Sequence, residues 1–477
     1  MSGNNESIDL RGQRTVCAIV PRGEVLRNFE YSGVFEQIRS KAGLSLLSIT
    51  TGSAIDKDLA NKYGRLLDLN EHPERWLVRY QREVLDVAHG KWLWSRAAQE
   101  RWRLRDIEAV TLKQKLSRAS KKALGLPLAN PAGLRALSKA ERISSKYLKK
   151  TDEYTQLFNR LKPSLVFNGS HIHSRNAIQA VQSAQWLGIP TATFIFSWDN
   201  LTSQGRITLP YDYFLVWNDE LKGQLLEMYE WIKPENVFVT GTPQFDFHFR
   251  PEFYCTREEF CGSVGADPAR PIVFYATGMA NHMPGEPQIV EEIADMLNEY
   301  PEAERPQLLV RVYPKDQTGR FDELKARRTD ILFPEVAWEA AWLTPKLEDS
   351  YALVNTLRHC AVGINVASTI SLELCMFDKP VINVGYNPPS VPATELSFAE
   401  YYEYDHYKPV VDSGAVRVAR SAREMNDLIS QALIDPARAS ENRRKLIGNM
   451  FGATLDGSSA HRVADVLLDL AQRDTNK

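Results

Sequence analysis

Two hydroxyl residues and a glutamate follow an apolar run in the last third of the chain. Ser368 and Thr369 come directly after the run 362–366 and begin a helix-like segment. Backbone N–H groups and the positive end of a helix can receive phosphate oxygens at such a place. Glu373 lies on the same face of the predicted helix, about one turn farther on, where its carboxylate can hold a ribose hydroxyl. The alternative is that a hydroxyl only caps the helix and that Glu373 is a solvated surface residue.

Two cations and a Thr-Gly pair follow other apolar runs of the same half. Arg311 and Lys315 lie near the carboxyl end of a predicted strand, the side on which open α/β sheets bind ligands. A guanidinium suits a diphosphate because it bonds bidentately, and an ammonium supplies a flexible charge. Thr277 and Gly278 also follow a predicted strand, and glycine permits close backbone approach. The alternative for the two cations is a surface charge pair with Asp316.

Two loops in the first part of the chain carry groups that can move a proton. His171 lies in the loop after the apolar run 164–168, and Asp199 lies in the loop after the run 191–196. Either a carboxylate or an imidazole there could act as the general base that deprotonates a hydroxyl. An Asx turn for Asp199 and a structural role for His171 stay equally open.

Metal and cofactor motifs are weak. Asp56 and Asp58 form an Asp-x-Asp, but it precedes a helix-like run in which aspartates cap, and no further oxygen ligands are evident nearby. The sequence contains neither GxGxxG nor GxxxxGK[ST]. We therefore expect no metal and no bound cofactor.

Parallel strands must hold these loops in place. Apolar runs alternate with helical patterns from Thr15 to Pro243, and the alternation restarts at Pro271 after a charged, aromatic stretch. Such alternation implies a parallel sheet covered on both faces. A chain of 477 residues also exceeds the usual size of one hydrophobic core. We expect an α/β protein with two Rossmann-like, doubly wound domains, 1–250 and 251–477, that face a cleft.

Three segments resemble motifs of GT-B glycosyltransferases. The stretch ASTISLELCMFDKPVINVGY at 367–386 resembles their donor-nucleotide motif, in which a strand, a Ser/Thr-rich turn, a helix glutamate and a KPVI strand recur in this order. VTGTPQFD at 239–246 resembles the junction where such chains leave the first domain. LVRVYPKD at 309–316 resembles their RxHP segment, with Tyr313 in place of the histidine.

The resemblance implies a function and roles for some of these residues. In that superfamily the turn binds the donor's phosphate and the glutamate its ribose, which here means Ser368, Thr369 and Glu373. It implies a metal-independent glycosyltransferase that moves a sugar from a nucleotide-activated donor, its substrate, to a glycan or lipid-linked acceptor in bacterial surface polysaccharide synthesis. Two alternatives share the fold, a nucleotide-sugar 2-epimerase and a CDP-alcohol phosphotransferase. A non-catalytic sugar-binding protein is an alternative of another class.

Further polar residues are singled out by position only. Glu24, Arg27 and Glu30 lie in the predicted loop after the first apolar run, where this superfamily often contacts its acceptor. His282 follows the turn that contains Thr277 and Gly278, and the run 404–407 follows the last clear predicted strand, near where donor sugars are usually held. The aromatic residues of that run could equally belong to the core.

A basic helical segment interrupts the alternation at about 75–159. Between Lys91 and Lys150 it contains sixteen Lys and Arg but four Asp and Glu, in a chain of net charge −2. Basic helices that carry Trp and Leu can lie in the headgroup region of an anionic membrane, whereas the alternative is a solvated face. The acidic remainder and the lack of a nucleic-acid module argue against nucleic acid.

The cysteines and the hydropathy predict the cellular setting. The five cysteines are scattered and lack CxxC spacing, which argues against a disulfide framework and a structural zinc site. No stretch approaches the apolar length that spans a bilayer, and the first residues lack the apolar core of a signal peptide. We expect a cytoplasmic protein, peripheral at most at the inner face of the cell membrane.

Overall fold

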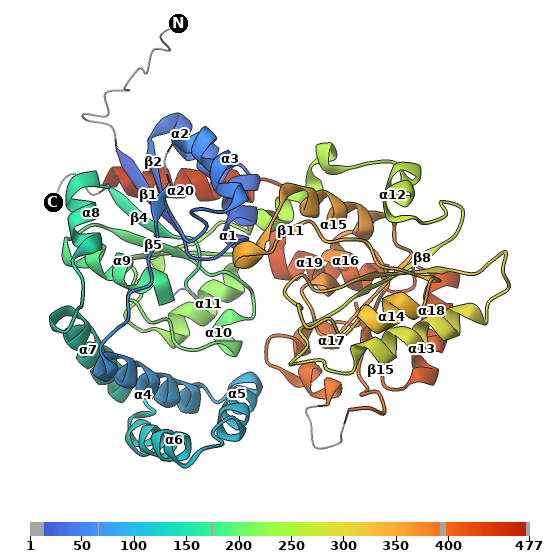
Figure 1. Ribbon diagram of the computed structural model, residues 1–477, viewed down its shortest axis with the longest axis horizontal. Helices are drawn as coiled ribbons and strands as arrows, with labels where there is room; N and C mark the ends of the chain where they lie inside the picture. Colours follow the sequence, from blue (N-terminus) through green and yellow to red (C-terminus); the bar gives the residue numbers. More distant parts are fainter. Residues whose placement is uncertain (1–13, 65, 173–174, 392–396, 474–477) are drawn as a thin grey trace, which may run out of the picture.

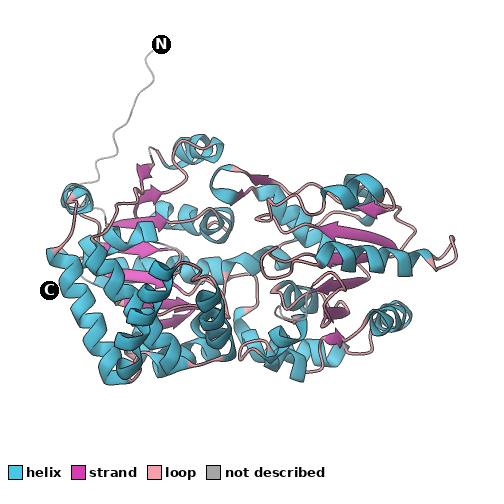
Figure 2. Ribbon diagram, turned by 60° about the horizontal axis from the view of Figure 1, so that its bottom comes forward, coloured by secondary structure: helices cyan, strands magenta, loops and turns pink. Residues whose placement is uncertain are grey.

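The structure is a computed structural model that describes residues 14–64, 66–172, 175–391 and 397–473. These residues form two α/β halves that lie side by side, each built on a parallel sheet (Figure 1). Helices pack on the sheets of both halves (Figure 2). The predicted fold class is thereby confirmed.

The first sheet has seven parallel strands in the order β3-β2-β1-β4-β5-β6-β7. In chain order the strands are β1 (Thr15–Val20), β2 (Gly43–Ser48), β3 (Leu67–Asp68), β4 (Leu165–Asn168), β5 (Thr191–Phe194), β6 (Tyr213–Val216) and β7 (Val237–Val239). β1 lies inside this sheet, and its residues from Val16 to Val20 are fully buried. Strands covered on both faces are continuous apolar runs, which is why the sequence signal for β1 is strong.

Helices connect these strands and cover them. They are α1 (Glu24–Leu26), the π-helix η1 (Arg27–Tyr31), α2 (Val34–Lys41), α3 (Ala54–Tyr63), α8 (Glu153–Leu161), α9 (Arg175–Trp186), α10 (Asn200–Ser203), α11 (Asp219–Met228) and η3 (Pro234–Asn236). The Asp-x-Asp lies in the first turns of α3, where Asp56 accepts the Gly52 N–H at 3.0 Å. Within the described part of the chain, no cluster of His, Cys, Asp and Glu could hold a metal ion.

The basic segment forms a group of helices to one side of the first sheet (Figure 1). They are α4 (Trp76–Leu93), α5 (Arg96–Ile107), α6 (Leu112–Gly125), η2 (Leu126–Leu128) and α7 (Pro131–Tyr147). α4 is the centre of the group and packs against α5, α6 and α7. Among the described helices, none combines the length and the apolarity needed to cross a membrane.

The second sheet has six parallel strands in the order β10-β9-β8-β13-β14-β15, and a short antiparallel ribbon accompanies it. The strands are β8 (Ile272–Ala276), β9 (Gln307–Arg311), β10 (Ile331–Leu332), β13 (Val362–Asn365), β14 (Val381–Val384) and β15 (Arg417–Ala419), and the ribbon is β11 (Trp338–Glu339) with β12 (Thr344–Pro345). The predicted strands after Pro271, Gln307, Ala361 and Lys379 match β8, β9, β13 and β14.

The helices of this half include several short turns. They are η4 (Pro243–Phe249), η5 (Pro251–Phe253), α12 (Arg257–Val264), α13 (Glu286–Asn298), α14 (Asp322–Arg327), η6 (Ala341–Leu343), α15 (Leu347–His359), α16 (Ile370–Met376), η7 (Phe398–Glu403), α17 (Lys408–Asp412), α18 (Ala422–Ile434), α19 (Ser440–Phe451) and η8 (Gly452–Thr454). η4 and η5 carry the chain from the first half to the second. α19 packs against α16.

The last helix, α20 (Ser459–Arg473), returns to the first half. It packs against β1, β4 and α2, and it lies beside the blue N-terminal elements in Figure 1. The Asp246 carboxylate in η4 accepts the backbone N–H of Ala460 at 2.7 Å and that of Ser459 at 3.1 Å. The boundary between 1–250 and 251–477 stays a prediction, and α20 belongs by its contacts to the first sheet.

Candidate functional site

The loops at the carboxyl ends of the two sheets meet between the halves. The loop after β1 contacts the loop after β9, where the Lys315 ammonium pairs with the Glu24 carboxylate. The loop after β5 contacts the turn after β13, where the Trp198 indole N–H donates to Thr369 Oγ1 at 3.2 Å. Open parallel sheets bind ligands outside these ends of their strands. These facing edges are therefore the candidate functional site.

Glu24 is buried and is the centre of an ionic cluster that joins the halves. Arg22 Nε donates to Glu24 Oε2 at 2.9 Å, and Lys315 pairs with Oε1. Burial opposes the charge of Glu24, but the two cations outweigh it and lower the pKa of the carboxyl to about 2. Burial and the nearby guanidiniums lower the pKa of Lys315. Arg27, whose Nη2 donates to Gln244 at 2.8 Å, is a third cation, so positive charge exceeds negative charge here.

The first-half members of this cluster lie on a helix, so the predicted loop is wrong. α1 begins at Glu24 and passes directly into the π-helix η1, which contains Arg27 and Glu30. Val25 is fully buried, and packing of such side chains favours a helix over an open loop. π-helical turns occur frequently at functional sites. Glu30 is buried and pairs with Lys62 of α3 at 3.0 Å.

Thr277 and Gly278 follow β8 and are tied to neighbouring protein groups. Thr277 Oγ1 accepts the Tyr313 backbone N–H at 2.8 Å, which joins the ends of β8 and β9. The Gly278 N–H donates to the Glu286 carboxylate at 2.9 Å. Burial raises the pKa of Glu286 to about 7, although Arg320 opposes the rise. Both predicted ligand residues therefore have partners that shape the edge of the sheet.

Arg311 also has a protein partner. Its guanidinium donates to both oxygens of the buried Asp349 carboxylate, at 2.8 and 2.9 Å. The Trp338 indole N–H donates to the same carboxylate at 2.8 Å. The sequence predicts the cation near a strand end but gives no signal for Asp349, which lies in α15. Lys315, in contrast, reaches across to the first half.

The turn between β13 and α16 presents two hydroxyls at the facing edges. The side chain of Asn365, which is fully buried, accepts the Ser368 N–H at 3.1 Å and fixes the turn. Ser368 Oγ accepts the Ile370 N–H at 3.3 Å, and Thr369 Oγ1 accepts the Trp198 indole N–H. Neither hydroxyl donates a hydrogen bond to a residue that the structure describes, so each O–H can donate to a ligand.

Glu373 lies in α16, and a histidine from the connection between the halves holds it. His248 Nε2 and Glu373 Oε2 are 2.8 Å apart, and His248 is almost fully buried in η4. Within the described residues, no hydrogen bond or ion pair is made to the second oxygen, Oε1. The sequence predicts Glu373 but misses His248, although the FDFHF run overlaps the predicted junction.

Asp199 precedes the short helix α10 at the interface. Its Oδ2 accepts the Ser203 hydroxyl at 2.6 Å, and the residue is half-buried. The neighbouring Trp198 ring packs edge-on against His406 of the second half, with centroids 5.2 Å apart. Thr202 Oγ1 lies 3.3 Å from His406 Nδ1, and burial lowers the pKa of that imidazole. The loop after β5 therefore meets the second half, as the sequence predicts.

His171 contacts the backbone at the end of β5. Its Nδ1 lies 3.2 Å from the Phe194 carbonyl oxygen and 3.4 Å from the Phe196 nitrogen, and the residue is buried. These contacts fit the structural role that the sequence leaves open beside the catalytic one. Of the two predicted bases, Asp199 is the one that directly follows Trp198, whose indole N–H donates to Thr369 of the second half.

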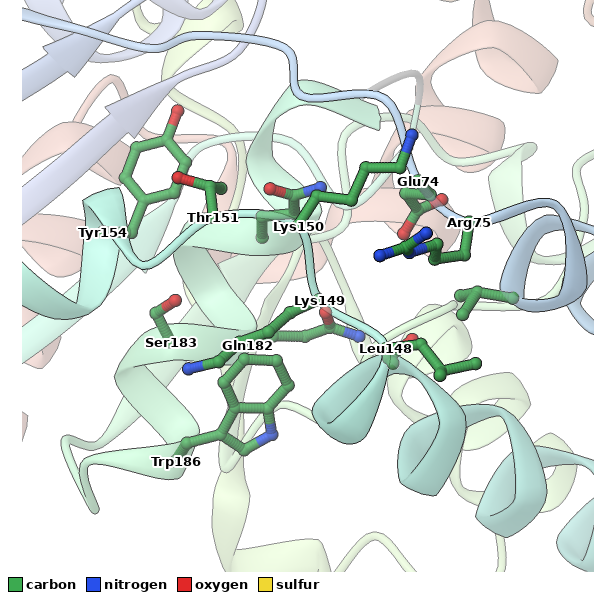
Figure 3. Close-up of a pocket in the computed structure, with 13 residues that line it drawn as sticks. Glu74, Arg75, Leu148, Lys149, Lys150, Thr151, Tyr154, Gln182, Ser183 and Trp186 are labelled. Carbon is green, nitrogen blue, oxygen red and sulfur yellow. The ribbon is translucent and has the colours of Figure 1, made fainter.

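A separate pocket lies in the first half, between the insertion and α8 and α9 (Figure 3). Lys149, Lys150, Gln182 and Trp186 are among the residues around it. None of the predicted site residues lines it. The pocket and the facing edges are therefore two different places.

Comparison with known proteins identifies a fold. The sequence matches no known protein family, and no curated protein matches it either. Among solved structures, the UDP-GlcNAc 2-epimerase from Neisseria meningitidis bound to UDP-GlcNAc is similar over 96% of this chain and 100% of that chain, with 12% identity and a TM-score of 0.53. The S. aureus MnaA-UDP structure is similar over 96% of this chain and 97% of that chain, with 12% identity and a TM-score of 0.54.

A glycosyltransferase is also among the similar structures. The one from Rickettsia africae is similar over 97% of this chain and 100% of that chain, with 12% identity and a TM-score of 0.51. The likeness extends over nearly the whole length of each protein, so it covers both halves and their arrangement. The chain has the two-domain GT-B fold.

Proposed function

We propose that the protein is a glycosyltransferase that takes a sugar from a nucleotide-activated donor and moves it to a glycan or lipid-linked acceptor in bacterial surface polysaccharide synthesis. The observation that carries the proposal is the contact between the 368–369 turn and the loop of Asp199. A donor group at the turn would lie beside the loop of the first half that contains Asp199. The similar structures that contain UDP-GlcNAc or UDP support a nucleotide-sugar as the ligand.

In this proposal the donor's diphosphate binds to the two hydroxyls and to the cations at the facing edges. Ser368 and Thr369 would each donate an O–H to a phosphate oxygen, because a phosphate oxygen can only accept a hydrogen bond and both hydroxyls carry a donor. Lys315 would exchange its pairing with Glu24 for the diphosphate, and Arg27 lies in the same cluster. Cations that meet a departing phosphate stabilise its developing charge, so the chemistry needs no metal in this proposal.

The other predicted donor-site residues would bind the ribose or support the binding edge. Glu373 would accept a ribose hydroxyl with Oε1 while His248 holds Oε2. Thr277, Gly278 and Arg311 would shape the binding edge through the protein contacts that they already make.

The base that deprotonates the acceptor is proposed to be Asp199, with His171 as the second candidate. Asp199 is half-buried and stands beside Trp198, which bonds the donor half. His171 is farther from this contact in the chain and bonds the backbone of β5. An acceptor hydroxyl within hydrogen-bond reach of the base is the geometric requirement.

A nucleotide-sugar 2-epimerase is the second candidate function. Several of the similar solved structures carry that name, including one from Methanocaldococcus jannaschii. An epimerase would bind the same donor at the same edges but would need no acceptor. This difference makes the two candidates separable.

The first test is a thermal-shift series with UDP-, GDP-, CMP-, CDP- and dTDP-linked sugars. A ligand present at a hundred times its Kd stabilises the native state by about 2.7 kcal/mol, which raises the melting temperature measurably. NMR of the best donor then distinguishes the candidates. Conversion to its 2-epimer without acceptor indicates the epimerase, whereas nucleotide release that depends on added acceptor indicates the transferase. If no donor stabilises the protein, both candidates fail.

Two variants test the assigned residues. Glu373→Gln is expected to weaken donor binding about tenfold, because a neutral amide oxygen replaces the charged carboxylate oxygen as the acceptor. Ser368→Ala is expected to weaken it by less, since a neutral hydroxyl is removed. Glu302→Gln, an exposed glutamate after α13, is the matched control and should bind as the wild type does. Unchanged affinity in Glu373→Gln would refute the ribose role.

A further inference from the structure

Exposed apolar side chains are concentrated on the helical insertion. Of the sixteen large apolar side chains that are exposed in the described residues, ten lie between Trp76 and Tyr147. Six of these ten form what we name the 107–126 surface: Ile107, Val110, Leu112, Leu116, Leu124 and Leu126. Val110 and Leu112 are each 74% exposed. Soluble monomers scatter single exposed apolar residues, and a group of this kind marks an interaction site.

The helix α6 is turned with its apolar face outward. Leu112, Leu116, Ala119 and Ala123 are spaced four, three and four residues apart, which places them on one face of the helix, and all four are exposed. A helix that packs on a protein core buries such a stripe. In Figure 1 α6 lies at the lower edge of the molecule, below α4.

Cations occupy the inner face of α6 instead. Arg118 Nε bonds Asp106 at 2.8 Å, and Lys122 Nζ bonds the same carboxylate at 2.5 Å. Lys121 Nζ pairs with Glu83 of α4 at 2.5 Å. Arg118 and Lys122 also lie over the Trp102 ring, at 4.7 and 4.9 Å from its centroid. These contacts hold α6 in the orientation that presents its leucines outward.

Unpaired positive charge borders the apolar stripe. Lys113 and Lys115 are exposed on α6 beside Leu112 and Leu116, and neither forms an ion pair with any residue that the structure describes. Lysines next to exposed leucines match an anionic bilayer, whose headgroups attract the cations while the acyl boundary receives the apolar side chains. A second copy docked face to face on this surface would bring its own lysines against these, which is unfavourable.

We propose that the 107–126 surface docks the protein on an anionic lipid bilayer. Leu112 and Leu116 enter the boundary between headgroups and acyl chains, and Lys113 and Lys115 contact lipid phosphates. α5 links this surface to the facing edges, because the Arg96 N–H donates to Asp405 of the second half at 2.9 Å. Membrane docking would bring the insertion side of the first half close to lipid. The inference does not depend on the transferase activity.

Flotation of the full-length protein with vesicles tests the proposal without any sugar. Vesicles of phosphatidylcholine alone are compared with vesicles of equal parts phosphatidylcholine and phosphatidylglycerol. The wild type should float with the second kind, and binding should weaken as salt is raised, because salt screens the attraction between charges. Failure to float with anionic vesicles at low salt would overturn the proposal.

Three variants separate the contributions. The double variant Leu112→Glu with Leu116→Glu should lose at least about tenfold in vesicle affinity, because two apolar side chains no longer enter the lipid. Lys113→Glu with Lys115→Glu should remove the preference for anionic vesicles. Ile434→Glu, in α18 and 84% exposed, is the matched control and should float as the wild type does. All these side chains are exposed, so circular dichroism should show the same fold and melting temperature.

Light scattering of the same variants tests whether a second copy of the protein, and not a bilayer, covers the 107–126 surface. A wild-type dimer that becomes a monomer in the leucine double variant, without vesicle binding by either protein, would show that a second copy covers the surface. Leucine double variants that bind anionic vesicles as tightly as the wild type would also overturn the proposal.

Discussion

At the level of single residues, the Glu24 carboxylate joins the two halves by pairing with a cation from each. Its carboxylate lies between Arg22 of its own loop and Lys315 of the other half. A buried carboxylate is unfavourable by itself, and here the two cations more than offset its desolvation. Without Glu24, two half-buried cations would lie close together with no anion between them. A bound diphosphate would supply an alternative anion at the same place.

Stability should therefore depend on pH through Glu24. Its pKa is about 2 in the folded protein and about 4.5 as the ordinary value, so its contribution is present above pH 4.5 and is lost as pH falls toward 2. Glu24→Gln should lower the free energy of unfolding by about 3 kcal/mol at pH 7 and by less than half of that at pH 3. Urea denaturation at the two pH values measures the difference.

An exposed glutamate supplies the control for that measurement. Glu235→Gln in η3 should change the free energy of unfolding little at either pH, because its side chain is exposed. A loss in Glu24→Gln that is equally large at pH 3 and pH 7 would contradict the ionic role.

Only part of the site is predictable residue by residue. Ser368, Thr369 and Glu373 lie in a local pattern of strand, turn and helix, and such a pattern is visible in one stretch of sequence. Their partners Trp198 and His248 come from other parts of the chain. A single indole or imidazole far away in sequence has no periodicity that marks it as a partner.

At the scale of elements, Gly23 allows the loop after β1 to approach the ribbon β11–β12 of the other half. A Cβ built on Gly23 would lie 2.3 Å from Thr344 Oγ1 and 2.6 Å from the Thr344 Cα. The second of these is a backbone atom, which cannot move aside by changing a rotamer. Glycine is therefore required here by the contact between two elements.

Gly23→Ala should thus loosen the contact between the halves. We expect a loss of about 1–3 kcal/mol in the free energy of unfolding, the usual cost of an overpacked site. Gly262→Ala in α12 is the matched control, because a Cβ there meets nothing within 4 Å. That variant should be neutral or gain up to about 1 kcal/mol, since alanine favours a helix. Thermal and urea unfolding measure the free energy of unfolding of both variants. Equal changes in the two would contradict the requirement for glycine at position 23.

Elements were predictable when their burial was continuous. β1, β4 and β8 are apolar runs because both faces of their sheets are covered. β10, β11 and β12 contain two residues each, too few for any period. α19 is not predicted either, because its buried residues include Ser440 and Arg443 and no apolar stripe results. α1 and η1 were also missed, because they contain three and five residues, too few to show a helical period.

At the scale of the whole molecule, α20 ties the end of the chain to its beginning. It packs on β1, β4 and α2, and Val463, Leu467 and Leu470 on it are fully buried. Asp246, from the connection between the halves, caps its first turn. The chain therefore crosses between the halves twice, and α20 completes the cover of β1 and β4.

Residues 1–250 alone should consequently fold poorly. Without α20 the apolar surface of β1, β4 and α2 is exposed to water. The free energy lost by exposing it exceeds the free energy of unfolding of a typical domain. Joining residues 456–477 to this fragment through a flexible linker should restore cooperative thermal unfolding, measured by circular dichroism. A fragment 1–250 that unfolds cooperatively and at the same temperature as the fusion would show that α20 is dispensable.

The two parallel sheets, the insertion and the turn at 368–369 can be recognised in the sequence, because burial on both faces and local turn chemistry leave a pattern in neighbouring residues. Which residues meet at the facing edges depends on the folding of distant segments against one another. Glu24 with Lys315, His248 with Glu373 and α20 with β1 are contacts between distant segments. The tertiary structure also decides the direction in which α6 points its leucines, because a helical period specifies one apolar face but not whether protein or another surface covers it.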